Sequence, residues 1–449
     1  MKQICFDLET TELDVHTCRI LGIAFSIEPL KAYYVSIPED KKRSAVIFKR
    51  LQIIFEDETI AKIGHNLKFD INVLRSHGIN VRGPIIDTMV MNYNLRPNDK
   101  KHGLKSLSLL HLNYKQQAFK DIAREVNGKL TIEGVEPKIV TPYACEDGDQ
   151  TIQLYNHLQP IIDQYKLNIP CQRDFDVVKV LASMEYNGVE IDKVELKKVE
   201  KQVLIDIASA KKIVEKVTKG DINLASSAQV SSFLFDKLLL IPIGQKGKNG
   251  HYSVSKNVLS KLIGKHEIIP ALLDYRALTT VKNTFIKALK ATHLVTGRLH
   301  TSFNLTSTST GRLSSSKPNL QNIPSRSVGK QLRAVFVAKE SHIFIGADYS
   351  NIELRVAAHL SQDSTMLNSY KNGVDVHALT ASKIFNINIK EVEKNQRDVA
   401  KTVNFGLLYG MSASGLSKKL ELEKHKYSPE QCQQFINDFF ELYEGVANF

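Results

Sequence analysis

Apolar and polar residues follow one pattern up to about residue 168 and another beyond it. Near the N-terminus, segments rich in β-branched and aromatic residues predict strands at 2–7, 20–26 and 32–37. Helical spacing predicts helices at 44–56, 66–77 and 142–166, while 97–141 is polar and irregular apart from a short helix at 105–112. The mixture predicts an α/β domain over residues 1–168.

Beyond this point the pattern is mostly helical. Apolar residues predict helices at 170–187, 192–218, 255–264 and 267–292, with a flexible basic loop at 244–250. Strand and loop signals return between about 296 and 345. The apolar run 342–348 predicts a buried strand that ends in Asp348, and Ser350 is a plausible N-cap for the helix that follows.

One predicted helix carries an unusual stripe of side chains. Arg397, Lys401, Phe405 and Tyr409 recur every four residues and therefore lie along one face. Cations followed by aromatic rings suit the phosphates and the nucleoside of a nucleoside triphosphate. A helix with a solvated Arg and Lys and two buried rings would show the same pattern, so the stripe alone leaves both readings open.

Three acidic motifs occur in the N-terminal part. Asp7 and Glu9 are two residues apart and share one face of a strand. Asp70 lies one turn into a helix for which Asn66 is the expected N-cap, and Tyr143 and Asp147 lie one turn apart on another helix. Acids at a strand end are common without a function, so the first pair alone favours a structural reading.

Four nearby residues are left out of the candidate site. The sequence favours a surface acid and a structural histidine for two of them, and the other two lie beside Asp147 but off its helical face or off the motif; they are Asp87, His65, Glu146 and Asp149.

Composition narrows the possible partners. The net charge is +12, and residues 237–298 hold eleven Lys or Arg against two acids. This imbalance favours contact with a polyanion, although a solvated basic face would look the same. The five scattered cysteines indicate reduced thiols, and neither a signal peptide nor a membrane span is evident. We therefore expect a cytoplasmic, monomeric protein with no membrane partner.

The sequence resembles the family A DNA polymerases, the DNA polymerase I group. The resemblance rests on an A motif at 348–355, a B motif at 397–410 and a third segment at 310–324. It implies a right-hand polymerase with a thumb at 169–295, the first part of a palm at 296–365 and incomplete fingers at 366–449. Asn351 departs from the Gln usual in the family, and we have no physical account of Asp398.

The N-terminal motifs, taken in order, resemble those of the Tyr-bearing DEDD 3′→5′ exonucleases, which have an RNase H-like fold. The resemblance implies that two Mg²⁺ ions, with Mn²⁺ as the alternative, are held by Asp7, Glu9, Asp70 and Asp147. Paired metals roughly 3.5–4 Å apart stabilise the attacking and leaving oxygens of a phosphodiester. Tyr143 would orient the attacking water.

The polymerase resemblance also implies roles for individual residues. Asp348 and the main-chain carbonyl of Tyr349 would bind catalytic Mg²⁺. Arg397 and Lys401 would neutralise the triphosphate, Phe405 would stack near the sugar, and Tyr409 would lie against the nascent base pair. The remaining contacts, to the sugar, a phosphate and the DNA near the growing end, fall to Glu353, His377, Arg312 and Arg326. As alternatives, Glu353 would be an ordinary helical salt-bridge partner and His377 a helix-start histidine without a ligand.

The family's second polymerase carboxylate lies in a C motif of the His-Asp-Glu type, which does not occur up to Phe449. The resemblance therefore implies a chain truncated before that motif, with uncertain nucleotide addition. We expect DNA-templated DNA synthesis with 3′→5′ proofreading in replication or repair, on a primer-template, a single-stranded 3′ end and deoxynucleoside triphosphates. The alternatives are a 3′→5′ DNA exonuclease with a non-catalytic, DNA-binding polymerase remnant, and a catalytically silent primer-template binding module.

Overall fold

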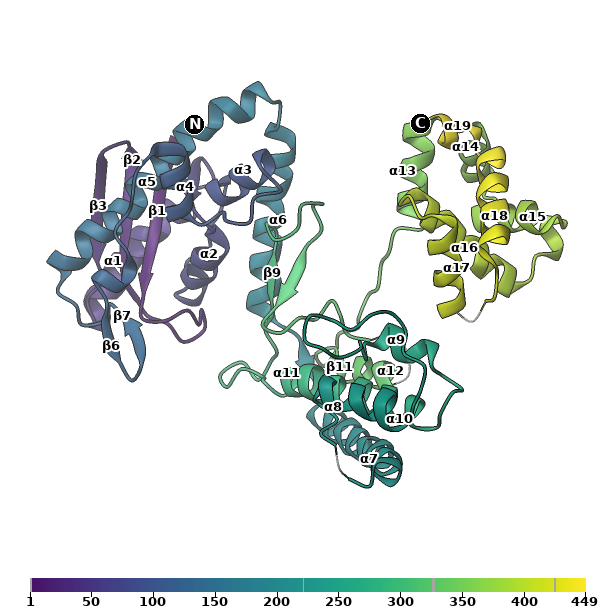
Figure 1. Ribbon diagram of the computed structural model, residues 1–449. Helices are drawn as coiled ribbons and strands as arrows, with labels where there is room; N and C mark the ends of the chain where they lie inside the picture. The colour runs from purple at the N-terminus through teal and green to yellow at the C-terminus, as the bar shows by residue number, and fades with distance from the viewer. Residues whose placement is uncertain (1, 221, 325–327, 424) are drawn as a thin grey trace. The chain divides into compact units, whose positions relative to one another are not determined.

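The computed structural model describes residues 2–220, 222–324, 328–423 and 425–449 (Figure 1). The chain divides into two compact units, Met1–Phe344 and Ile345–Phe449. No helix in the described ranges is both long and apolar enough to cross a membrane.

The first unit begins with a mixed five-stranded sheet, and the purple strands in Figure 1 belong to it. Its strand order is β3-β2-β1-β4-β5. Strand β1 is antiparallel to β2 and parallel to β4, β2 is antiparallel to β3, and β4 is parallel to β5. The strands are β1 (Lys2–Thr10), β2 (Ile20–Glu28), β3 (Lys31–Ser36), β4 (Ile60–Gly64) and β5 (Ile85–Asp87). This topology confirms the predicted RNase H-like α/β fold.

The first three strands were predicted, but β4 and β5 were not. Strand β4 has a lysine at its centre, and Lys62 is fully buried. Its ammonium donates hydrogen bonds to the backbone carbonyls of Asp57 and of Arg82, the latter at 2.7 Å. These carbonyls replace water around the charge and allow a lysine to be buried in the strand. A prediction of buried strands from apolar residues therefore misses β4.

Helices cover the sheet and complete its core. They are α1 (Lys41–Phe55), α2 (Leu67–Ser76), α3 (Thr88–Leu95), α4 (Leu104–Leu112) and α5 (Pro137–Gln164). Helix α5 packs on β1, β2 and β3, and the core beneath includes Phe6, Leu8 and Phe55. The segment between α4 and α5 holds a 3₁₀ turn η1 (Phe119–Asp121) and the hairpin of β6 (Arg124–Val126) and β7 (Lys129–Thr131).

The rest of the first unit is largely helical, as predicted. Helix α7 packs along α10 and buries Leu196, Val199 and Val203 at helical spacing. The helix predicted at 267–292 consists of three consecutive helical segments, α10 (Ile268–Thr280), the π-helical η3 (Val281–Ile286) and α11 (Lys287–Leu289). The helices are α6 (Asn168–Asn187), α7 (Lys193–Thr218), α8 (Ser227–Ser232), η2 (Phe233–Lys237), α9 (Lys256–Lys261), α10 (Ile268–Thr280), η3 (Val281–Ile286), α11 (Lys287–Leu289) and α12 (Val328–Ala334).

The first unit also contains two short pairs of antiparallel strands. Strand β9 (Ser302–Asn304) pairs with β10 (Ser314–Ser316), and β8 (Glu190–Ile191) pairs with β11 (Phe336–Val337). In α2, Lys68 donates to Glu185 of α6 at 2.6 Å and also to the backbone carbonyl of Phe303 in β9. These contacts connect a helix of the sheet domain to the β9–β10 pair.

The second unit is a helical bundle. Its helices are α13 (Ile352–Ser361), α14 (Ser364–Lys371), α15 (Val376–Phe385), η4 (Ile389–Glu391), α16 (Lys394–Leu408), α17 (Ala413–Leu422), α18 (Pro429–Leu442) and α19 (Glu444–Asn448). Tyr443 is fully buried at its centre and lies 2.9 Å, oxygen to oxygen, from the Thr380 hydroxyl. The predicted boundaries of thumb, palm and fingers stay predictions.

Candidate active site

Two carboxylates project from one face of β1. Strand β1 extends to Thr10, so both Asp7 and Glu9 lie within it, opposite Ala24 and Gly22 of β2. Leu8, between them, is buried in the hydrophobic core. The alternation of a strand therefore separates the acids from the apolar residue, as the sequence predicted.

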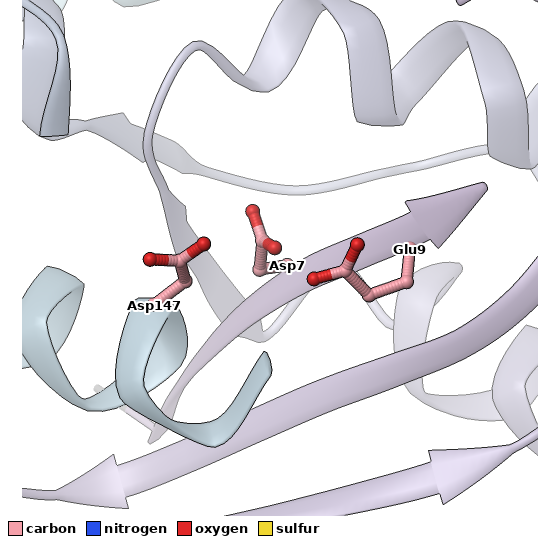
Figure 2. Close-up of side chains that lie close together, drawn as sticks. All are labelled: Asp7, Glu9 and Asp147. Atoms are coloured by element: carbon pink, nitrogen blue, oxygen red, sulfur yellow. The ribbon is translucent and has the colours of Figure 1, made fainter. Parts of the chain in front are cut away.

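Helix α5 brings a third carboxylate to the same place. Tyr143 and Asp147 lie one turn apart on α5, and both are buried. One carboxylate oxygen from each of Asp7, Glu9 and Asp147 lies within 4.8 Å of the other two. Figure 2 shows the three side chains, two from the strand and one from the helix, gathered at one point. The structure thus brings together residues 140 positions apart.

Asp70 lies on α2 beside this group but outside the set within 4.8 Å. It is 4 % exposed, and its negative charge helps to raise the pKa of both Asp7 and Glu9. The four predicted carboxylates therefore interact electrostatically, and three of them form the tighter cluster.

The electrostatics of the cluster favour bound protons when no cation is present. Burial, followed by the charges of Asp70, Asp147 and Glu9, raises the pKa of Asp7 well above its usual range. Burial raises the pKa of Glu9 to about 8, of Asp70 to about 8 and of Asp147 to about 6. Four carboxylates this close repel one another when all are charged, so full deprotonation of the cluster requires nearby positive charge.

The position of α2 depends on Asp87, which the sequence interpretation placed at the surface. That interpretation was wrong, because Asp87 is 2 % exposed. Its carboxylate accepts hydrogen bonds from the backbone N–H groups of Asn66 at 3.0 Å, Leu67 at 2.8 Å and Met89 at 2.9 Å. It therefore satisfies the first N–H groups of both α2 and α3.

Asn66 does stand at the N-cap position of α2, but its side chain makes no capping hydrogen bond. Its backbone has φ 61°, in the left-handed region, which Asn tolerates better than most residues. The cap that Asn66 was predicted to supply comes from Asp87 instead. His65 Nδ1 lies 2.9 Å from the Thr88 hydroxyl, and its assignment as a structural histidine stays a prediction.

Replacing Asp87 with alanine is expected to lower the free energy of unfolding by about 2–4 kcal/mol, because three N–H groups lose a buried acceptor. Chemical denaturation monitored by circular dichroism measures the change. Asp176→Asn is the matched control, since that carboxylate is 61 % exposed and Nζ of its ion-pair partner Lys179 lies 3.8 Å away. A loss no larger than that of the control would show that Asp87 does not hold the helix ends.

A segment that sequence reasoning missed lies over α5. Gln116 is buried, and its Nε2 donates to Asp147 Oδ1 at 2.6 Å. Glu146 accepts from the Tyr114 hydroxyl at 2.9 Å and from the Gln117 N–H at 2.8 Å. Residues 114–117 have no periodic pattern, so no sequence signal identified Gln116 as a partner of Asp147.

Glu146 and Asp149 have structural partners, in agreement with their exclusion from the candidate site. Glu146 holds the segment just described, while Asp149 accepts hydrogen bonds from the Leu30 N–H at 2.5 Å and from Gln153 at 2.6 Å. Neither belongs to the cluster within 4.8 Å.

In the second unit, the predicted stripe lies on α16, which ends at Leu408 with Tyr409 as its C-cap. Arg397 and Phe405 are half-buried, whereas Lys401 and Tyr409 are exposed. Arg397 Nε lies 2.6 Å from Asp375 Oδ2. The stripe is therefore accessible along much of its length, with its first cation already paired.

His377 is buried, at 1 % exposure. One ring nitrogen lies 2.9 Å from Asn404 Nδ2 and the other 3.2 Å from Asn351 Oδ1. Burial, opposed by the Asp375 charge, lowers the pKa of His377 to about 4. A neutral imidazole with both nitrogens engaged would have to release Asn351 before it could bind a phosphate. Glu353, in the first turn of α13, is half-buried.

The strand predicted at 342–348 is not formed in the structure. These residues form no strand, and Ile343, Phe344 and Ile345 are 81, 62 and 85 % exposed. A strand needs a neighbour for its N–H and C=O groups, and no described strand pairs with this segment. Asp348 and Tyr349 are consequently exposed, not carried at a buried strand end.

The predicted N-cap after this segment was also wrong. Asn351, with φ 51°, occupies the N-cap position of α13, and Ser350 precedes it. Of the two predicted DNA-contacting arginines, Arg312 is exposed between β9 and β10. Arg326 lies outside the described residues.

Comparisons with known proteins identify both parts of the chain. A family model described as DNA polymerase family A matches residues 193–449, and one described as 3'-5' exonuclease matches residues 1–163. The chain is 35 % identical to DNA polymerase I of Pseudomonas aeruginosa, over 99 % of this chain and 50 % of that protein. It is also 35 % identical to DNA polymerase I of Borreliella burgdorferi, over 100 % of this chain and 49 % of that protein.

A solved structure is similar over nearly the whole chain. The POL domain of Pol1 from M. smegmatis, in complex with DNA primer-template and dNTP, gives a TM-score of 0.82 at 27 % identity, covering 99 % of this chain and 73 % of that one. The chain spans about half the length of the curated relatives it matches.

Proposed function

The chain belongs to DNA polymerase family A, and we propose that its N-terminal domain removes nucleotides from DNA 3′ ends by metal-assisted hydrolysis. The observation that carries this proposal is the group of Asp7, Glu9 and Asp147 oxygens within 4.8 Å of one another, in the part of the chain matched by the 3'-5' exonuclease family. The DNA polymerase family A model matches residues 193–449 of the same chain, so here the activity would proofread newly made ends.

The donor set fits hard divalent cations. All the candidate ligand atoms are carboxylate oxygens, which Mg²⁺ prefers. Burial raises the pKa of Glu9, Asp70 and Asp147, and bound divalent cations would favour their charged forms. We infer that Asp7, Glu9, Asp70 and Asp147 hold two Mg²⁺ ions, with Mn²⁺ as the alternative. Bound there, such ions supply stabilisation of the attacking and leaving oxygens.

The chain's own groups would position the substrate and the water. Tyr143 lies one turn before Asp147, and burial together with the charges of Asp147, Glu9 and Asp7 raises the pKa of its hydroxyl. The hydroxyl therefore stays protonated and is able to donate a hydrogen bond to the attacking water. Gln116 keeps one oxygen of Asp147 in a fixed orientation.

We further propose DNA-templated DNA synthesis, in replication or repair, as the function of the polymerase part, residues 169–449. Support comes from the family A match and from the similarity to a polymerase domain bound to primer-template and dNTP. The proposed contacts to the triphosphate and DNA are those predicted above. Asp348 and the carbonyl of Tyr349 would bind metal at this second site.

One observation favours a second candidate, in which the polymerase part binds primer-template without extending it. Asp348 is exposed on an unpaired segment, and within the described residues the one acidic cluster suited to a metal is that of Asp7, Glu9 and Asp147.

Purified chain incubated with 5′-labelled oligonucleotides separates these proposals. We expect stepwise shortening of a single-stranded DNA from its 3′ end with Mg²⁺, and none with EDTA. Absence of shortening with Mg²⁺ or Mn²⁺ would refute the exonuclease proposal. Extension of a primer-template with dNTPs would exclude the second candidate, whereas binding without extension would support it.

A further inference from the structure

Lys105 brings a positive charge to the edge of the acidic cluster. It is the second residue of α4, after the N-cap Gly103. Its Nζ donates to the hydroxyl of Tyr143 at 3.3 Å and to the carbonyl of Gln117 at 2.5 Å, and it lies 4.6 Å from the centre of the Tyr143 ring. The ammonium is therefore held in place by three contacts on the side of α5 that carries the candidate site.

The charge of Lys105 acts on the carboxylates themselves. It opposes burial at three of them, lowering the pKa that burial raises at Asp7, Glu9 and Asp147. Lys105 is half-buried, so water screens this interaction incompletely. The lysine is thus an electrostatic member of the site, although no acidic motif includes it.

We propose that Lys105 binds the phosphodiester at the 3′ end of the DNA and holds Tyr143 in position for the reaction. This inference rests on the exonuclease function proposed above. The four carboxylates carry four negative charges, which two divalent cations neutralise. The scissile phosphodiester then brings one more negative charge into a buried site, and Lys105 supplies the positive charge that balances it.

The contact with Tyr143 gives Lys105 a second effect. An ammonium over an aromatic face is attracted to the ring, and the same group donates to the hydroxyl. Because Nζ contacts the oxygen of Tyr143, the hydroxyl keeps its own hydrogen for donation to the attacking water while the ammonium holds the ring in place. Lys105 is accordingly a substrate-binding and positioning residue, not a metal ligand.

A purely structural lysine would fix Gln117 and Tyr143 without contacting the phosphate. The two roles differ in their dependence on the charge of the substrate. If Lys105 balances the phosphate, its removal harms a negatively charged terminal linkage and spares a neutral one. If it only supports the fold, both linkages suffer equally.

The test compares the unsubstituted chain with Lys105→Met on two single-stranded oligonucleotides, one with a normal terminal phosphodiester and one with a methylphosphonate there. Binding is measured by fluorescence anisotropy with Ca²⁺, and shortening of the normal oligonucleotide with Mg²⁺. We expect Lys105→Met to weaken binding of the charged oligonucleotide by about 10-fold and of the neutral one by less than about 2-fold.

The ratio of the two affinities does not depend on the fraction of folded protein, so partial misfolding cannot mimic the result. Lys105→Arg keeps the charge and is expected to keep the discrimination. Lys138→Met is the control, because Lys138 is 77 % exposed and paired with Glu136 at 2.5 Å. Equal losses on both oligonucleotides, or no loss on either, would overturn the role of Lys105. Failure of the unsubstituted chain to shorten DNA would instead refute the exonuclease proposal itself.

Discussion

Replacing Asp147 with alanine is expected to reduce metal-dependent shortening of single-stranded DNA by roughly 1,000-fold or more, since a lost metal ligand removes several kcal/mol of transition-state stabilisation. Asp147 is the proposed ligand on α5, and without it the cluster keeps only Asp7 and Glu9 of β1 and the more distant Asp70. Asp7→Ala is expected to have the same effect. Single-turnover degradation of a 5′-labelled oligonucleotide measures both losses.

Asp149→Ala is the matched control for this experiment. Asp149 lies two residues after Asp147 on the same helix, but its carboxylate accepts from the Leu30 N–H and from Gln153. We expect this variant to lose some stability and to retain the rate of shortening within about 3-fold, since Asp149 lies outside the cluster of proposed metal ligands. Unchanged degradation by Asp147→Ala or Asp7→Ala would show that the cluster is not the catalytic centre.

The parts of the site that follow from local periodicity were predictable from the sequence. Asp7 and Glu9 share a face because side chains alternate along a strand, and Tyr143 and Asp147 share a face because a helix repeats after nearly four residues. What brings the two pairs together is the packing of α5 on β1 and β2. That packing was expected from the family resemblance and not from the periodicity itself.

The supporting residues were not predictable in this way. Gln116 lies in a segment with no regular pattern, and Lys105 stands at the start of a short helix whose sequence gives no sign of the acids nearby. Asp87 was assigned to the surface because an isolated acid usually lies there. Its burial depends on free N–H groups at two helix starts, and such a partnership exists only in the folded chain.

The segment before Asp348 illustrates a different limit. Its apolar residues predict a strand, and the same residues are exposed and unpaired in the structure. An apolar run favours burial, but a strand forms only where a neighbouring strand offers free N–H and C=O groups. The apolar pattern alone therefore did not predict the structure of this segment.

Magnesium is expected to raise the melting temperature of the N-terminal domain by roughly 5–10 °C at pH 8 and by much less at pH 5, at a concentration about 100 times its dissociation constant. The difference follows from the carboxyl groups. Their pKa in the folded protein is raised, to about 8 for Glu9 and Asp70 and to about 6 for Asp147. Because the folded chain then binds more protons than the unfolded chain, stability without metal falls as the pH rises from about 4 to 8.

Divalent cations bind the deprotonated carboxylates, so they restore stability mainly where those protons would be lost. Half-buried His65 changes stability in the opposite direction. Burial lowers the pKa of His65 from 6.5 to about 4, and its contribution is lost as the pH falls through this range. Since this effect is the same with and without metal, the difference between scans in Mg²⁺ and in EDTA isolates the carboxylates. Differential scanning calorimetry at pH 5 and pH 8 measures it, and Asp7→Asn should diminish the metal effect at pH 8. An equal rise at both pH values would mean that Mg²⁺ binds elsewhere, because only a site with raised pKa values couples its metal affinity to pH in this range.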